Sequence, residues 1–366
     1  MYITYYAHSK PTTQILNYAD IMRAENVEQP ITHYKTTIYI QHPTPLHGLQ
    51  NYQKRAIEQA QNYLDEAYMC LQPFKDNYET QYYEFKIPKR SGGLRTINAP
   101  NLEFKKALTK VKDIFEQKLK CLAHDCAYAY VKQRSVKDAL EKHQKNQSNW
   151  YLKIDLKDFF PNCTPNLIYN NLKQLYPFYY FDEAHNETLK KIIDICCLHN
   201  GLPQGTPMSP LLTNLIMIPY DFKLNNILKR GKGNHWIYTR YADDILISAK
   251  SNFNWQELEQ ILAQHLYPFE IKHSKTRYGS KAGSNWNLGL MLNKDNNITL
   301  GSSKKRLINA MLNNYLRDRS NRVEWNLPDK QHLQGQLSYL KSIEPEYYAA
   351  IVNKYTIKYN TALTFN

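Results

Sequence analysis

The segment WIYTRYADDILIS (residues 236–248) decides how this 366-residue chain is expected to fold. β-Branched and aromatic residues fill both ends of the segment, and the sequence Tyr-Ala-Asp-Asp (residues 241–244) lies between them. This pattern predicts a β-hairpin with two acids at its tip. Neighbouring carboxylates repel each other, and they gain by crowding together only where they share a cation. The acidic pair alone is weak evidence, because many acidic turns simply bind water.

A third acid belongs to the stretch YLKIDLKDFF (residues 151–160). The first half of the stretch alternates between apolar and polar residues as a half-buried strand does, and Asp155 lies at the end of that strand. We expect this strand to lie next to the acidic hairpin in one sheet, so that the carboxylates of Asp155, Asp243 and Asp244 gather at one edge. Hard oxygen ligands of this kind suit Mg²⁺ and leave room for substrate phosphates.

The segment GLPQGTPMSP (residues 201–210) lies between the two acidic stretches. Its glycines and prolines predict a rigid backbone that other groups can approach closely, just before a helix. Gln204, followed by Gly205, is therefore well placed to contact a substrate or the backbone of a template. A purely structural turn is the alternative interpretation.

Residues 81–100 predict two short strands joined by a basic turn at residues 88–93. Lys89, Arg90 and Arg95 would clamp a triphosphate, and the guanidinium of Arg95 offers paired hydrogen bonds. In isolation, such a turn is more often only a solvated basic loop.

Helical periodicity marks the remaining long elements of the chain. The expected helices cover residues 50–72, 102–122, 208–228 and most of the chain after residue 303. The last of these regions carries a basic surface.

The composition of the chain favours a nucleic-acid partner. Lys and Arg total 47 against 33 for Asp and Glu, which gives a formal net charge of +14. Binding to a polyanion is favourable for such a chain because it releases counterions. The 30 tyrosines suit stacking on unpaired bases, although we expect most of them to pack in the core.

The sequence shows no apolar run long enough to span a membrane, no signal peptide and no basic amphipathic helix. The expected location is therefore the cytoplasm, with no membrane partner. The six cysteines lack zinc-like spacing, and we expect them to be reduced thiols without a chemical role.

Taken together and in this order, the basic hairpin, the strand Asp, the LPQG segment and the YADD hairpin resemble the conserved blocks of reverse transcriptases. The resemblance runs from about Pro88 to Asp244, with a weaker continuation into the C-terminal helices. It implies an α+β, right-hand polymerase fold with an antiparallel palm sheet. The implied domains are an N-terminal extension (1–80), fingers (81–150), a palm with a primer-grip hairpin (151–295) and a helical thumb (296–366).

The resemblance also implies the metal site. Asp155 and Asp243 would bind two Mg²⁺ ions, with Mn²⁺ as an alternative ion. Asp244 would lie beside them, and Leu156 would lend its backbone carbonyl. Lys275 matches the lysine that follows the hairpin and would protonate pyrophosphate.

For the substrates, the resemblance implies that Phe160 excludes a ribose 2′-hydroxyl and so selects dNTPs. The residues implied to lie near the nucleotide or the template are Lys89, Arg90, Arg95, Gln204, Gly205 and Tyr241. The implied partners are a structured RNA template, a DNA or RNA primer and dNTPs, and an effector protein or a second copy of the chain is a further candidate.

The residues of the LPQG segment and the short length of the chain most resemble those of retron and related bacterial phage-defence reverse transcriptases. Two positions depart from the retron pattern. Asn287-Leu288-Gly289 stands where those enzymes carry Val-Thr-Gly, and Asp138-Ala139 with His143 only partly matches their Asn-Ala-x-x-His element. A diversity-generating reverse transcriptase is an alternative subgroup.

The predicted activity is RNA-directed DNA synthesis for a bacterial retroelement or an antiphage defence system. One alternative is template-independent or protein-primed DNA synthesis, with a tyrosine hydroxyl as the primer. RNA-dependent RNA synthesis is a second alternative, which Phe160 disfavours. An RNA-binding scaffold with an idle polymerase site is a third, which the three acids disfavour.

Overall fold

The computed structural model describes residues 2–7, 10–15, 46–88, 92–230, 235–281, 286 and 289–365. Lys89 and Arg90 of the expected basic turn lie outside these residues, as do Asn287 and Leu288 of the segment 287–293, which resembles a primer-grip hairpin. Among the described residues, no helix combines the length and the apolar composition that crossing a membrane requires.

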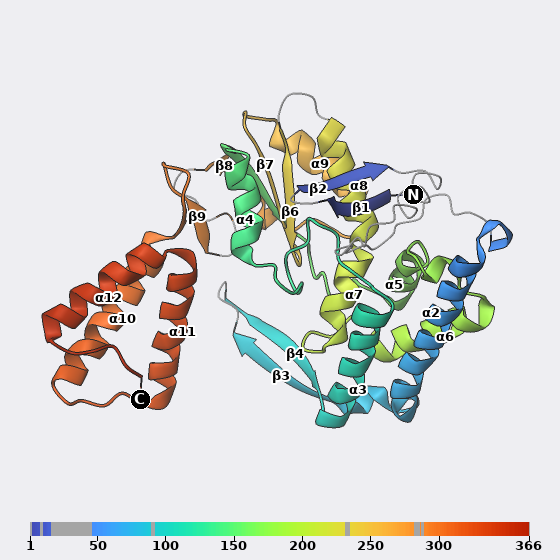
Figure 1. The fold of residues 1–366 in the computed structure, drawn as a ribbon, viewed down its shortest axis with the longest axis horizontal. Coiled ribbons are helices and arrows are strands. Elements are labelled where there is room, and N and C mark those ends of the chain that lie inside the picture. Colours follow the sequence, from blue (N-terminus) through green and yellow to red (C-terminus); the bar gives the residue numbers. More distant parts are fainter. Residues whose placement is uncertain are drawn as a thin grey trace.

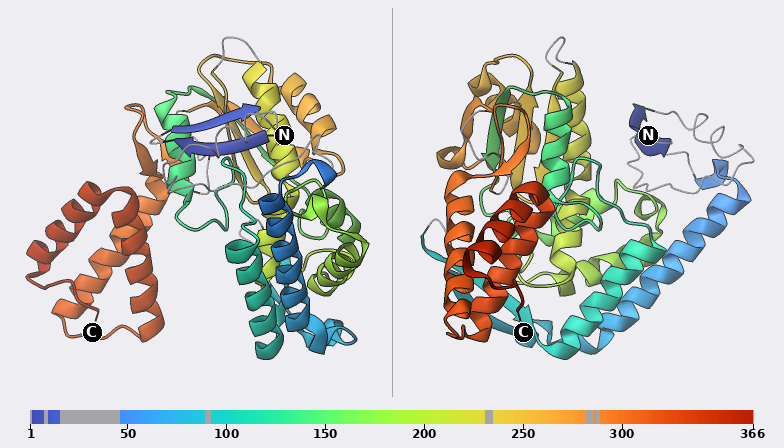
Figure 2. Two further views of the ribbon diagram at one scale, coloured as in Figure 1. Left: turned by 45° about the vertical axis from the view of Figure 1, so that its right-hand side comes forward. Right: turned by 60° about the vertical axis from the view of Figure 1, so that its left-hand side comes forward.

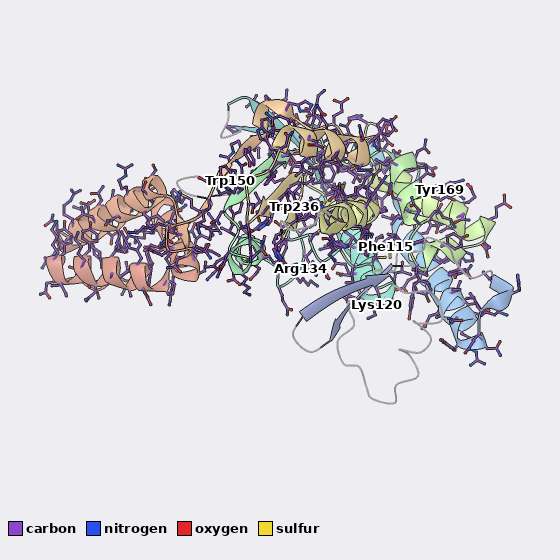
Figure 3. The ribbon with its side chains drawn as sticks, turned by 90° about the horizontal axis from the view of Figure 1, so that it is seen from above. Phe115, Lys120, Arg134, Trp150, Tyr169 and Trp236 are labelled. Carbon is purple, nitrogen blue, oxygen red and sulfur yellow. The ribbon has the colours of Figure 1, made fainter. Side chains whose placement is uncertain are left out.

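A four-stranded antiparallel sheet forms the centre of the fold (Figure 1). Its strands, in spatial order, are β6 (Ile237–Tyr241), β7 (Asp244–Ala249), β5 (Trp150–Asp155) and β8 (Arg277–Ser280). The predicted acidic hairpin and the predicted strand are confirmed, and they are neighbours in this sheet. Asp155 pairs with Asp244 in the register of β5 and β7. Trp150 and Trp236, labelled in Figure 3, lie at the end of the sheet away from these acids.

Both faces of this sheet are buried. Leu152 and Ile154 of β5 pack on one face against three helices. These helices are α7 (Met208–Ile216), α8 (Ile218–Arg230) and α9 (Trp255–Leu266). Tyr151 and Leu246 point to the opposite face, where they share a core with the C-terminal helices. Burial of both faces fixes the register, since a slip of one residue would exchange the two faces.

The long apolar helix expected over residues 208–228 is instead two helices, α7 and α8, which meet at Met217. Pro219 explains the break, because its backbone lacks the N–H that a continuous helix would need there. The expectation of one helix was therefore wrong, although the helical content of the segment is confirmed.

The helix α4 (Val136–Lys145) covers part of the second face of the sheet. Asp138 belongs to the cap of this helix, because its Oδ2 accepts a hydrogen bond from the backbone N of Ser135 at 2.7 Å. His143 is fully buried near the other end, with ring nitrogens 2.5 Å from Ser248 Oγ and 2.8 Å from Thr239 Oγ1. Burial lowers the pKa of His143 to about 3, so a neutral imidazole joins the helix to two strands.

A separate antiparallel hairpin consists of β3 (Tyr82–Pro88) and β4 (Leu94–Pro100), as predicted. A further group of helices packs together, with α2 (Asn51–Leu71) against α3 (Leu102–Asp113) and α6 (Glu183–Cys196), and α5 (Pro165–Leu172) against α6. α3 begins where the side chain of Asn101 accepts a hydrogen bond from Phe104 N at 2.9 Å. It continues as one π-helical turn, η4 (Ile114–Lys118), so this helical region ends before residue 122.

The C-terminal helices α10 (Ser302–Ser320), α11 (Leu327–Ile343) and α12 (Pro345–Tyr359) pack on one another, as Figures 1 and 2 show. Leu312, Leu316, Leu337 and Leu340 form the centre of this bundle. The short hairpin of β9 (Leu290–Leu292) and β10 (Ile298–Leu300) connects it to the central sheet. The helical C-terminal region expected from the sequence is confirmed.

The remaining described elements are short. They are the hairpin of β1 (Tyr2–Ala7) and β2 (Lys10–Ile15), and the 3₁₀ turns η1 (Leu46–Gly48), η2 (Gln72–Phe74), η3 (Tyr78–Gln81), η5 (Phe178–Tyr180) and η6 (His273–Lys275).

Candidate active site

Three acids meet at one end of the central sheet. β5 ends at Asp155, which pairs with Asp244 at the start of β7. The backbone N of Leu156 donates a hydrogen bond to the carbonyl of Asp243 at 3.1 Å. The structure therefore brings together the acids that the sequence places 88 positions apart, the difference between 243 and 155. The side chain of Leu156 is buried, and its backbone forms an isolated antiparallel β-bridge with Ile271.

The turn that carries Asp243 is a two-residue hairpin loop. Tyr241 pairs with Asp244, so only Ala242 and Asp243 form the loop between the strands. Ala242 adopts a left-handed backbone conformation with φ of 57°. This conformation costs about 1–2 kcal/mol for a residue with a side chain, so the surrounding structure must stabilise it.

Two lysines pair with two of the acids. Lys275 Nζ lies 2.9 Å and 2.8 Å from the two carboxylate oxygens of Asp155. Lys153 Nζ lies 3.0 Å from Asp244 Oδ2, and both of these side chains are mostly buried. Burial raises the pKa of Asp243 to about 6, and the charge of Asp244 and then that of Asp155 contribute. The edge of the sheet thus concentrates negative charge that cations relieve.

A divalent cation fits this donor set. The three carboxylates supply hard oxygen ligands at one end of two paired strands, and Mg²⁺ prefers ligands of this type. Asp155, Asp243 and Asp244 are the residues that would hold such ions.

Phe160 lies in the segment that follows β5, five positions after Asp155. Its ring is partly buried and meets Phe159 edge-to-face, with the centroids 5.9 Å apart. The carbonyl of Phe160 accepts a hydrogen bond from the backbone N of Leu202 at 3.0 Å, which joins it to the LPQG segment. Tyr241, half-buried, precedes the acidic turn.

The LPQG segment lies against the hairpin of β3 and β4. The carbonyl of Gln204 accepts a hydrogen bond from the backbone N of Asn98 in β4 at 2.8 Å. Gly205 has φ of +121°, and a Cβ there would lie 2.9 Å from Ile97 Cγ2. Glycine is therefore required both for the backbone conformation and for the close approach of β4. Arg95, on the same strand, is exposed.

The sequence interpretation missed a buried ion pair beneath the acidic turn. Arg240 and Asp221 are both fully buried, with Arg240 Nη2 2.8 Å from Asp221 Oδ2 and Nε 2.9 Å from Oδ1. Arg240 Nη1 also donates to the carbonyl of Ala242 and to Asn214 Oδ1, each at 3.2 Å. The guanidinium thus holds the strained residue of the turn. A charged residue inside an apolar strand was the available sequence signal, because such a charge needs a buried partner.

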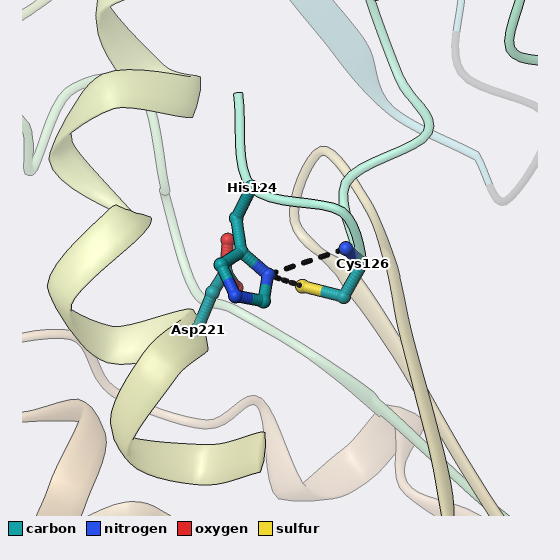
Figure 4. A group of neighbouring side chains, drawn as sticks. All are labelled: His124, Cys126 and Asp221. Atoms are coloured by element: carbon teal, nitrogen blue, oxygen red, sulfur yellow. Dashed lines mark hydrogen bonds between the residues drawn. The ribbon is translucent and has the colours of Figure 1, made fainter. Parts of the chain in front are cut away.

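His124, Cys126 and Asp221 form a second cluster, shown in Figure 4, with ligand-type atoms within 4.8 Å of one another. His124 Nδ1 lies 3.1 Å from Cys126 Sγ. Burial lowers the pKa of His124 to about 4 and raises the pKa of the Cys126 thiol well above its usual value. Asp221 already accepts hydrogen bonds from Arg240 and from Tyr238, so its charge is compensated. We interpret the cluster as a hydrogen-bonded core, because a dication would have to displace a buried guanidinium from its carboxylate.

Comparison with known proteins agrees with the resemblance seen in the sequence. The family described as "Reverse transcriptase (RNA-dependent DNA polymerase)" matches residues 87–305. The chain is 28% identical to the retron Ec83 reverse transcriptase of Escherichia coli, over 77% of this chain and 89% of that protein. It is 31% identical to the retron Ec73 reverse transcriptase of Escherichia coli, over 74% of this chain and 86% of that protein.

Among solved structures, the chain is similar to apo telomerase from Candida tropicalis, with 14% identity and a TM-score of 0.48 over 76% of this chain and 58% of the other. That likeness is too distant to bear on the assignment. The family match and the central antiparallel sheet with its flanking helices establish an α+β, right-hand polymerase fold. The chain belongs to the reverse transcriptase family and is an RNA-directed DNA polymerase of the retron type.

Proposed function

We propose that this protein copies a dedicated, structured RNA into DNA by two-metal nucleotidyl transfer, for a bacterial retroelement or an antiphage defence system. The observation that carries the proposal is the meeting of Asp155, Asp243 and Asp244 at one end of β5 and β7. The similarity to retron reverse transcriptases supports the choice of RNA as the template and a retroelement as the setting.

Asp155 and Asp243, beside Asp244 and the carbonyl of Leu156, would hold two Mg²⁺ ions, or Mn²⁺ in their place. Such ions, when bound, activate the primer 3′-hydroxyl and neutralise the leaving pyrophosphate. The chain contributes the placement of the ligands, since the register of β5 and β7 fixes where the carboxylates lie. Lys275, whose ammonium already lies against Asp155, is proposed to give a proton to pyrophosphate.

Around this centre, Gln204, Gly205 and Tyr241 are proposed to contact the incoming nucleotide and the template. Arg95 would bind the triphosphate from the fingers hairpin, where its side chain is exposed. Lys89 and Arg90 are proposed to assist it.

For the whole chain, we propose that residues 1–80 form an extension, 81–150 the fingers, 151–295 the palm and 296–366 the thumb. The basic surplus of the chain suits a duplex of RNA template and primer, in addition to dNTPs. An effector protein or a second copy of the chain is proposed as a further partner, and the cytoplasm as the location.

Protein-primed or template-independent synthesis is the second candidate function, because the chain carries 30 tyrosines whose hydroxyls can accept a nucleotide. Incubation with labelled dNTPs and a defined RNA, followed by denaturation and protease digestion, separates the two candidates. Label in protein-free DNA that is complementary to the RNA supports the first. Label that remains on the protein until digestion supports protein priming, and protein-free DNA that does not follow the RNA sequence supports template-independent synthesis. A diversity-generating element is an alternative setting for the same chemistry.

Phe160→Ala is expected to lower the preference for dNTPs over NTPs by roughly a hundredfold. Removal of the ring opens the space that a 2′-hydroxyl would need, and exclusion of one hydroxyl changes kcat/KM by about a hundredfold. The measurement is kcat/KM for dGTP and for GTP on the same RNA template and primer. Phe253→Ala, which removes a partly buried ring elsewhere, is the matched control and should keep the wild-type preference. An unchanged preference in Phe160→Ala would refute the proposed sugar selection.

A further inference from the structure

Tyr130 is an aromatic residue that the roles described above leave unused. It follows the buried segment of residues 126–129 and has a left-handed backbone conformation with φ of 61°. Its side chain remains 51% exposed, so burial of the ring in the core does not account for this conformation. Left-handed conformations of bulky residues are uncommon and often mark a functional constraint.

The backbone before Tyr130 is fixed to the strand that leads into the acidic turn. Arg240 exchanges two backbone hydrogen bonds with this segment, donating to the carbonyl of Cys126 at 2.7 Å and accepting from the N of Tyr128 at 2.8 Å. The buried side chain of Asn214 donates to the carbonyl of Ala129 at 2.9 Å. Asn214 in turn accepts from the Arg240 guanidinium. The same buried group therefore holds both the acidic turn and the residue immediately before Tyr130.

The ring of Tyr130 lies against Phe160. The two rings are nearly perpendicular, at 82°, with their centroids 6.5 Å apart. The pKa of the Tyr130 hydroxyl is raised by partial burial and by the charges of Asp243 and Tyr241. The charge of Arg95 acts in the opposite direction and lowers it. Tyr130 is thus near enough to Asp243 and to Arg95 for both charges to act on its hydroxyl, and its ring contacts Phe160.

We propose that Tyr130 is a specificity-determining residue, which supports the ring of Phe160 from the side and so sharpens discrimination against a ribose 2′-hydroxyl. The inference rests on the proposed role of Phe160. A ring excludes a hydroxyl only while it keeps its position, and Phe160 is only partly buried. An edge-to-face contact from a residue with a fixed backbone restrains the ring where core packing does not surround it.

The test measures the ratio of kcat/KM for dGTP to kcat/KM for GTP on one RNA template and primer, in wild type and five variants. These variants are Tyr130→Ala, Tyr130→Phe, Phe160→Ala, the double variant Tyr130→Ala with Phe160→Ala, and Tyr179→Ala. Tyr130→Ala should lower the ratio by roughly three- to tenfold, about the factor that an edge-to-face contact is worth. Tyr130→Phe keeps the ring and should have the same ratio as the wild type. Tyr179, 41% exposed and in contact with Tyr180, is the control for loss of a surface tyrosine and should leave the ratio unchanged.

The double variant separates support of Phe160 from direct contact with the sugar. If Tyr130 acts through Phe160, Tyr130→Ala has no further effect on the ratio once Phe160 is Ala. A further decrease would overturn the inference in favour of direct contact. A normal ratio in Tyr130→Ala, together with a lowered ratio in Phe160→Ala, would refute the inference and leave the proposed role of Phe160 intact. A normal ratio in Phe160→Ala would instead refute that role, and the inference with it.

The ratio of kcat/KM for dGTP to kcat/KM for GTP also distinguishes a loss of specificity from a folding defect. A partly unfolded preparation loses activity with dGTP and GTP in the same proportion, so the ratio does not change. Should Tyr130→Ala fail to yield folded protein, Tyr130→Leu retains apolar bulk without the ring edge and should lower the ratio in the same direction.

Discussion

Asp243→Asn is expected to reduce primer extension on an RNA template by roughly a thousandfold or more, which corresponds to about 4 kcal/mol of transition-state stabilisation. Asparagine has the shape of aspartate but lacks the charge that a metal ligand at this position supplies. Binding of RNA should be retained, because the substitution removes no positive charge. Single-turnover extension with Mg²⁺ and dNTPs measures the first effect, and filter binding of the RNA measures the second.

The same variant should be more stable than wild type when divalent ions are removed with EDTA. Since the pKa of Asp243 is raised to about 6, the folded protein disfavours the ionised carboxylate. This cost is at most about 3 kcal/mol above pH 6, where the group is ionised in both states, and it vanishes below about pH 4, where the group is protonated in both. The gain in melting temperature of Asp243→Asn should therefore be present at pH 7.5 and absent at pH 4.

Asp76→Asn is the matched control, because the side chain of Asp76 is 86% exposed and pairs only weakly with its neighbour, at 3.9 Å from Lys75. It should change neither extension nor stability. Extension by Asp243→Asn at the wild-type rate would refute the assignment of Asp243 as a metal ligand.

Arg240→Met is expected to lower the free energy of unfolding by about 3–5 kcal/mol, because it leaves the carboxylate of Asp221 buried without its cation. The variant also loses the hydrogen bond from the guanidinium to the carbonyl of Ala242. The acidic turn should then be less well fixed, and extension should fall in the protein that remains folded. Urea denaturation measures the stability, and extension by folded protein at low temperature measures the activity.

The double variant Asp221→Asn with Arg240→Met removes both charges and should recover part of the lost stability. Lys190→Met breaks the exposed ion pair with Glu187 and should leave the urea midpoint close to that of the wild type. If Arg240→Met unfolds at the urea concentration of the wild type, the buried pair does not have the structural role described above.

The sequence was sufficient to predict the elements that carry the acids. The alternation in β5 has a period of two residues, which determines both that strand and the side on which Asp155 lies. The two runs around YADD were marked instead by their β-branched and aromatic residues. The family resemblance then supplied the order of the blocks. The break between α7 and α8 was also readable from Pro219, although apolar periodicity continued across it.

Contacts between elements could not be predicted in the same way. The pairing of Arg240 with Asp221, 19 residues away, depends on how α8 packs against β6, and no local pattern specifies it. The contact of Tyr130 with Phe160 depends in turn on a loop whose course follows from that pair. Lys153 could be predicted only in part. Its position in the strand placed it on the same side as Asp155, but the sequence did not identify Asp244 as its partner.

The most direct test of RNA-directed DNA synthesis at Asp155 and Asp243 uses a defined RNA template with an annealed primer, Mg²⁺ and the four dNTPs. The product is sequenced and also examined by denaturing electrophoresis. Wild type should make DNA that is complementary to the template and migrates free of protein, and Asp155→Asn should make none. DNA that does not follow the template sequence, or an equal yield from Asp155→Asn, would contradict this assignment.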